Sequence, residues 1–158
     1  MTRDDVIRDT AKHIRSVGRL MVAVSAELSH RAVVHDQSKW SEEEWPAYEA
    51  STPKLAGLTY GSPEYKAACA ELGPALAHHY CHNSHHPEYW EAPEGESKVS
   101  QMNLMDVIEM LCDWKAASER HADGSILRSI QINQGRFKID DQLGRVMLNT
   151  ARFFGWIP

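Results

Sequence analysis

The segment from Val33 to Trp45, VVHDQSKWSEEEW, places a histidine, an aspartate and a lysine within five residues. A turn that only faces solvent does not need this combination. Imidazole nitrogen and carboxylate oxygen, offered by His35 and Asp36, are typical ligands of divalent metal ions. Lys39 beside them would contact a phosphate group. The segment therefore indicates a metal site that handles a phosphorylated substrate, although Lys39 alone is equally compatible with a solvated side chain.

Histidine is unusually frequent, with nine residues in the chain, and five of them fall between His78 and His86. This group lies inside the chain, so it is not a terminal tag. Histidine is the commonest metal ligand among side chains. The group indicates further ligands, whereas the alternative is a polar loop without a bound ion.

The segment MNLMDVIEMLCDWKAASERH is the clearest helix of the sequence, and one narrow stripe of it is purely acidic. At 100° per residue this stripe holds Asp106, Glu109 and Asp113, between broad apolar faces. A buried carboxylate costs several kcal/mol unless it is paired or bound to a cation. The stripe is therefore either a thin solvent-exposed seam or a face turned toward a metal ion.

An apolar stripe near the start of the chain contains one more histidine. It comprises His13, Val17, Leu20, Met21, Val24 and Leu28, at steps of three and four residues. This spacing places them on one helix face, so His13 is expected to point inward, either as a core histidine or as a ligand. No cysteine belongs to the candidate set, which argues against a structural zinc site and leaves Mn, Fe, Co, Ni or Zn in a functional one.

Helical periodicity dominates the rest of the chain, and no alternating strand pattern is present. Ser41 and Glu44 have the spacing of a capping box, and Ser62 precedes a proline as the N-cap of another helix. An irregular loop is expected from about 82 to 100, and helices over about 125–133 and 141–154. We therefore expect an all-α fold of six or seven helices, in a single domain over residues 1–158.

Composition narrows the class of protein further. The chain has 158 residues, 42% hydrophobic and 25% charged, with a formal net charge of −5 and no basic cluster that would indicate nucleic-acid binding. Its three cysteines are far apart and form no CxxC pair. It has no signal-peptide pattern and no run near the roughly 18 apolar residues of a membrane span. A cytoplasmic protein is expected, with no membrane partner. The aromatic C-terminal segment RFFGWIP leaves an oligomer open.

The order of these motifs resembles the HD superfamily of metal-dependent phosphohydrolases. That superfamily has an early histidine, a His-Asp dyad and a later aspartate, which here correspond to His13, HDQSK at 35–39 and MDVIEML at 105–111. Over nearly its full length the chain also resembles short HD-like proteins of bacteria and phages, which share HDxSK, HHPEYW and MLCDW and form a domain of unknown function. The first resemblance implies an HD-domain-like helical bundle; the second implies no activity, and a host-cytoplasmic location if phage-encoded.

The HD resemblance implies two groups of ligands. His13, His35, Asp36 and Asp106 would hold a first ion. In two-metal members further histidines hold a second ion, and His79, His85 and His86 would serve here with Asp36 as the bridge. The sequence departs from the pattern at Ser38, where the superfamily has glycine. It also lacks a histidine between Asp36 and His78 and the GYP signature of the cyclic-dinucleotide branch.

The expected function is hydrolysis of a small phosphomonoester, with a nucleotide as the favoured substrate. Lys39 would contact the phosphoryl group, and Glu109 or Asp113 would act as general acid or base. Two alternatives stay open. One is an HD-type di-iron oxygenase, and the other is a metal-containing binding protein without turnover.

Overall fold

The computed structural model describes residues 1–59, 62–120 and 123–158, and His121 lies outside these ranges. All regular elements within them are helical. They are α1 (Arg3–Val34), η1 (Gln37–Trp40), α2 (Trp45–Leu55), α3 (Pro63–Ala70), α4 (Gly73–His82), η2 (Pro87–Tyr89), η3 (Lys98–Gln101), α5 (Leu104–Glu119), α6 (Ile126–Arg136) and α7 (Asp141–Phe153). The prediction of an all-α protein with six or seven helices is confirmed. No helix in these ranges combines the length and apolar character needed to cross a bilayer.

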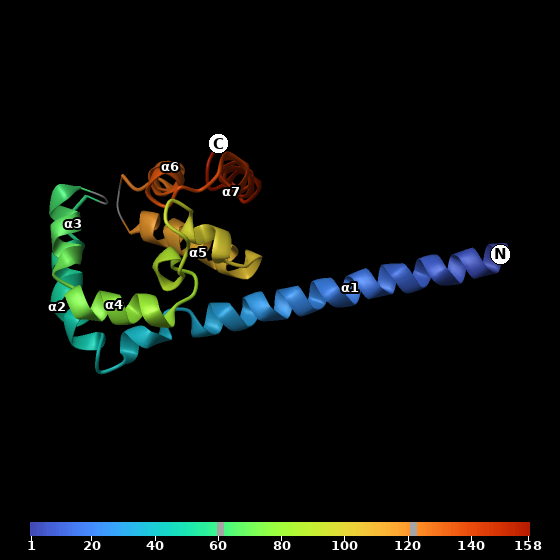
Figure 1. Ribbon diagram of the computed structural model, residues 1–158, viewed down its shortest axis with the longest axis horizontal. Coiled ribbons are helices and arrows are strands. Elements are labelled where there is room, and N and C mark those ends of the chain that lie inside the picture. Colours follow the sequence, from blue (N-terminus) through green and yellow to red (C-terminus); the bar gives the residue numbers. More distant parts are fainter. Residues whose placement is uncertain (60–61, 121–122) are drawn as a thin grey trace. The chain divides into compact units, whose positions relative to one another are not determined.

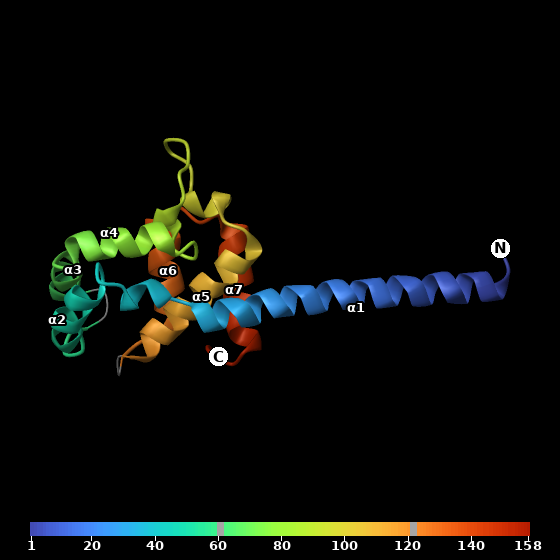
Figure 2. The same cartoon turned by 90° about the horizontal axis from the view of Figure 1, so that it is seen from below.

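The chain divides into two compact units, Met1–His35 and Asp36–Pro158. The first unit is α1, a helix of 32 residues that appears as one unbroken ribbon in Figures 1 and 2. Thr2 and Asp5 form a capping box at its start. No proline lies between residues 1 and 45, so nothing in the sequence interrupts this helix. At about 1.5 Å per residue it is about 48 Å long. The expected single domain over residues 1–158 stays a prediction.

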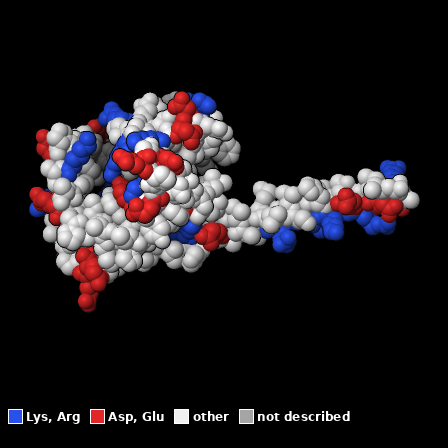
Figure 3. All heavy atoms as spheres, in the orientation of Figure 1, with Lys and Arg blue, Asp and Glu red and all other residues white. Residues whose placement is uncertain are grey.

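The charged side chains of α1 are unevenly distributed around the helix. Figure 3 shows its Lys and Arg residues gathered along one edge over most of the helix, with uncharged residues on the opposite edge. The uncharged edge follows from the apolar periodicity of the sequence.

The hydrophobic core of the second unit lies among α5, α6 and α7, which pack in that order (Figure 1). Met110 of α5, Ile130 of α6 and Met147 of α7 are almost fully buried at its centre. Gly144 also lies on the buried face of α7, where a Cβ atom would lie only 2.8 Å from the side-chain amide nitrogen of Gln134. A side chain at position 144 would therefore have to displace the end of the Gln134 side chain.

Helices α2, α3 and α4 carry the remainder of the second unit. The hydroxyl of Ser62 accepts a hydrogen bond from the Tyr65 amide, so its predicted role as N-cap of α3 is confirmed. Gly73, with φ of 42°, separates α3 from α4 in a backbone conformation that suits glycine. The short helix η1 contacts both α2 and α4, and α4 contacts η2. This arrangement brings η1, the start of α2 and the histidine-rich end of α4 together.

Candidate metal centre

Asp36 is the central residue of the candidate site. It lies immediately before η1 in the left-handed region, with φ of 55°, a conformation that aspartate adopts more readily than most residues. One carboxylate oxygen, Oδ2, accepts a hydrogen bond of 2.5 Å from Lys39 Nζ. The other, Oδ1, lies 3.2 Å from His79 Nε2 and 3.4 Å from His85 Nε2. Two imidazoles from different segments thus face the same carboxylate oxygen.

A third imidazole completes this cluster. His86 Nε2 lies 3.0 Å from His79 Nε2, and one ligand atom from each of Asp36, His79, His85 and His86 lies within 4.8 Å of the other three. Atoms bound at about 2.1 Å to one ion lie about 3.0 Å apart in octahedral geometry and about 3.4 Å apart in tetrahedral geometry. The measured spacings of 3.0, 3.2 and 3.4 Å match that range. We call these four residues the DHHH cluster.

The buried imidazole of His79 is held from behind by a carboxylate. Its Nδ1 lies 2.9 Å from Glu44 Oε2 and 3.1 Å from the hydroxyl of Ser38. The side-chain amide of Asn83 donates to that hydroxyl at 2.7 Å and to the His79 carbonyl at 2.8 Å. A proton on Nδ1, donated to Glu44, leaves the Nε2 lone pair directed into the cluster. Ser38, the departure from the HD pattern, is therefore part of the support for His79.

Glu44 is fully buried and binds two histidines at once. Besides His79, it contacts His78, whose Nδ1 lies 2.8 Å from Oε1. Burial raises the pKa of Glu44, but hydrogen bonds from His78 and Ser38 and the neighbouring His79 outweigh burial, so the pKa lies below its ordinary value. Glu44 is therefore an anion placed behind the cluster, one residue before α2.

The capping box predicted for Ser41 and Glu44 is only half present. The Ser41 hydroxyl accepts from the Glu44 amide at 3.3 Å, but the Glu44 side chain turns to the histidines. The Ser41 amide instead donates to the Ser38 carbonyl at 2.9 Å, which leaves the Glu44 carboxylate to bind the two imidazoles. Sequence reasoning assigned this glutamate a local role and missed its place at the site.

The acidic stripe of α5 contributes a second supporting carboxylate. Glu109 Oε1 lies 3.2 Å from His85 Nδ1, on the side of the ring opposite to Asp36. His79 and His85 are thus both oriented by a glutamate at Nδ1, an arrangement common behind metal-bound histidines. Glu109, which was expected as a general acid or base, instead lies behind His85, on the side of the ring that faces away from Asp36.

Burial also sets the charge state of the third imidazole. Loss of solvent around His86, together with the neighbouring His85 and His79, lowers its pKa to about 2. The ring is therefore neutral at physiological pH and can offer a lone pair to a cation. The Tyr48 ring lies nearly perpendicular to that of His79, and burial together with the charges of Glu44 and Asp36 raises the pKa of Tyr48 well above its ordinary value.

Comparison with known proteins identifies the family but no activity. Residues 2–152 match the family described as "Family of unknown function (DUF5662)". The chain belongs to DUF5662. No curated protein sequence and no solved structure matches the chain. The residues of the candidate site are therefore what indicates a function for this DUF5662 protein.

Within the second unit of the DUF5662 chain, the structure brings four predicted ligands together, namely the DHHH cluster. His13 is not among them. It lies on α1, 22 positions before His35, which corresponds to about 33 Å along one continuous helix. Within one chain, the expectation that these two histidines share an ion is therefore not met, because one unbroken helix holds their side chains far apart.

The remaining candidates have other contacts. Asp106 is fully buried, accepts from the Ser84 hydroxyl at 2.7 Å and from the Asn103 amide at 3.0 Å, and completes the capping box of α5. Its role as a ligand stays a prediction. Asp113 has a carboxylate oxygen within 4.8 Å of one of Asp36. It therefore lies at the edge of the DHHH cluster, where a general acid or base was expected.

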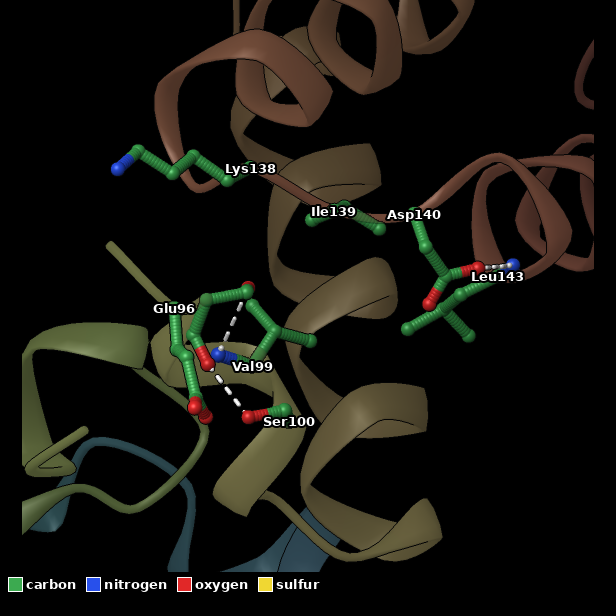
Figure 4. Close-up of a pocket in the computed structure, with 8 residues that line it drawn as sticks. Glu96, Val99, Ser100, Lys138, Ile139, Asp140 and Leu143 are labelled. Atoms are coloured by element: carbon green, nitrogen blue, oxygen red, sulfur yellow. Dashed lines mark hydrogen bonds between the residues drawn. The ribbon is translucent and has the colours of Figure 1, made fainter. Parts of the chain in front are cut away.

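A separate hollow of about 270 Å³ lies away from these residues (Figure 4). It is lined in part by Ser97, Ser100 and Asp140. The Ser97 hydroxyl caps η3, and Asp140 caps α7 by accepting from the Leu143 amide at 2.9 Å. These polar groups serve the helix ends, so the hollow offers no convergent set of ligands and is not the candidate site.

Proposed function

We propose that this protein is a metal-dependent phosphohydrolase acting on a small phosphomonoester, with a nucleotide as the favoured substrate. The observation that carries the proposal is the convergence of three imidazole nitrogens on Asp36, with Glu44 and Glu109 orienting two of the rings from behind. A three-histidine, one-carboxylate set suits a divalent transition metal, and Mn, Fe, Co, Ni and Zn all fit these donors.

The donor set fits a functional metal site better than a closed structural one. Structural zinc sites are usually closed by cysteines, and no cysteine belongs to the DHHH cluster. A bound ion would supply a water molecule of lowered pKa and offset negative charge on a phosphoryl group. Asp113 lies near Asp36, and its carboxylate could accept or donate a proton there.

Lys39 supports the choice of a phosphorylated substrate. Its ammonium group contacts Asp36 and lies 5.3 Å from the centre of the Tyr48 ring, while its side chain is partly exposed. It can therefore turn from the carboxylate toward an anion arriving from solvent without losing its position beside the cluster. A lysine acts on phosphate as a compact positive charge, which suits this arrangement.

The test compares metal content and hydrolysis in the untagged protein and in Asp36→Ala. We expect the wild-type protein to retain metal and to release phosphate from at least one of a panel of nucleoside monophosphates. Asp36→Ala should lose both, whereas Asp123→Ala, an exposed aspartate of the same unit, should keep both. Full turnover by Asp36→Ala refutes the proposal. Two irons with dioxygen consumption would indicate an oxygenase instead, and metal without turnover would indicate a binding protein.

A further inference from the structure

Helix α1 carries an apolar stripe that no other element of its own unit can cover, because that unit is a single helix. The stripe has a seven-residue repeat. Its members are Ile7, Ile14, Met21 and Leu28 at intervals of seven, and Thr10, Val17 and Val24 three positions after the first three of these. Six of the seven are apolar. We call this set the α1 seam.

Between residues 8 and 26, no formal charge lies on either flank of the α1 seam. From residue 8 to residue 26 the formal charges lie only on the far side of the helix, at Arg8, Asp9, Lys12, Arg15 and Arg19. The positions that border the seam on one flank are Ala11, Gly18 and Ser25, which are small enough to let another backbone approach. The other flank holds His13, the exposed Leu20 and, beside Leu28, Glu27, which pairs with Arg31 of the same helix. A surface helix that faces only water has no reason to separate charge in this way.

We propose that α1 pairs with α1 of a second copy of this chain through the α1 seam. A straight α-helix has 3.6 residues per turn, so its apolar stripe drifts around the helix. A strict seven-residue repeat keeps the seam facing a partner helix along its whole length, as in coiled coils. A second copy presents the same flanks, and the flanking Glu27 already pairs with Arg31 of its own helix, so pairing leaves no charge buried without a partner. The inference does not depend on the metal centre or on its activity.

The area available is sufficient for a stable pair. Seam residues such as Ile14, Met21 and Val24 are between 47% and 67% exposed. With about 80 Å² hidden for each of eight seam and flank side chains, the two helices together would bury about 1,300 Å², within the range of specific interfaces. The pair would be of moderate affinity, so its population should depend on protein concentration.

Sedimentation velocity of the full chain over a range of concentrations tests the proposal. We expect a concentration-dependent dimer in the wild-type protein and a monomer for Met21→Glu, which places a charge in the seam. Val22→Glu is the matched control, because Val22 adjoins Met21, is equally exposed (68% against 67%) and lies outside the seam. This variant should dimerise as the wild type does.

A second variant separates loss of pairing from loss of helix. Replacing Val17 and Val24 together with alanine removes apolar area while raising helix propensity, so it cannot act by unfolding α1. We expect this variant to weaken the dimer at least tenfold with unchanged circular dichroism. A wild-type protein that is monomeric at every concentration, or a dimer that survives Met21→Glu and the double alanine variant, overturns the inference.

Discussion

Replacing Glu44 with glutamine tests how the DHHH cluster is held together. The change keeps the size of the side chain but removes the charge and replaces one acceptor oxygen with an amide group. In the structure both oxygens are in use, at 2.8 Å from His78 Nδ1 and 2.9 Å from His79 Nδ1. Glutamine can accept from only one of these rings, and its amide must face the other.

The expected loss follows from the tautomer of His79. If the glutamine amide faces His79, the ring must accept at Nδ1 and carry its proton on Nε2, where it points toward Asp36. A protonated Nε2 cannot bind a metal ion. If the carbonyl faces His79 instead, the tautomer is kept but the ring loses its anionic partner. Loss of such a supporting carboxylate costs about 10- to 100-fold in metal affinity, which is about 1.4–2.7 kcal/mol.

Competition with a chromophoric chelator measures that affinity directly, without any need for a known substrate. Glu42→Gln is the matched control, since Glu42 lies two residues away and is exposed, and the change in net charge is the same. We expect Glu42→Gln to bind Zn²⁺ or Mn²⁺ as the wild type does. An unchanged affinity in a folded Glu44→Gln variant would show that Glu44 does not orient a ligand.

Three further predictions concern the same unit. Glu109→Gln should lower metal affinity by about tenfold, less than Glu44→Gln, because Glu109 supports one histidine of the cluster at 3.2 Å whereas Glu44 holds His79 at 2.9 Å and also binds His78; an effect as large as that of Glu44→Gln would contradict this order. The pKa of His86 is lowered in the folded chain from 6.5 to about 2, so the unfolded chain takes up a proton there first. The metal-free protein should therefore lose stability as the pH falls below 6.5, by at most about 1.4 kcal/mol per pH unit, and His86→Gln should flatten that slope in denaturant titrations. Ile130→Ala should cost about 2–5 kcal/mol of unfolding free energy, whereas Ile132→Ala on the same helix should change it by about 0.5 kcal/mol or less, since Ile130 is 0% and Ile132 48% exposed. Equal losses would contradict the assigned core.

Features that depend on local pattern could be predicted from the sequence. Helix α5 and its acidic stripe follow from periodicity over 16 residues, and the N-cap Ser62 follows from its position before Pro63. The DHHH cluster could be predicted from the sequence for a different reason. Its residue types have little other reason to accumulate, and three of its members lie within eight positions of the chain.

Features that depend on contacts between residues far apart in the chain could not be predicted from local pattern. Glu44 and His78 are 34 residues apart, and the sequence around Glu44 offered a complete local explanation as a helix cap. The sequence did contain a signal that His13 and His35 lie far apart. No helix breaker stronger than Gly18 lies between them, and 22 residues of uninterrupted helix place two side chains far apart.

The three imidazoles of the cluster come from a stretch that begins with His79 and ends with His86. Closing so short a loop costs little chain entropy, even before the rest of the protein has formed. A denatured chain therefore keeps most of its donors within reach of an ion and competes for it. Metal added to this protein should raise its melting temperature by less than the affinity of the native state alone would give. The reason is that the unfolded chain also binds the metal ion.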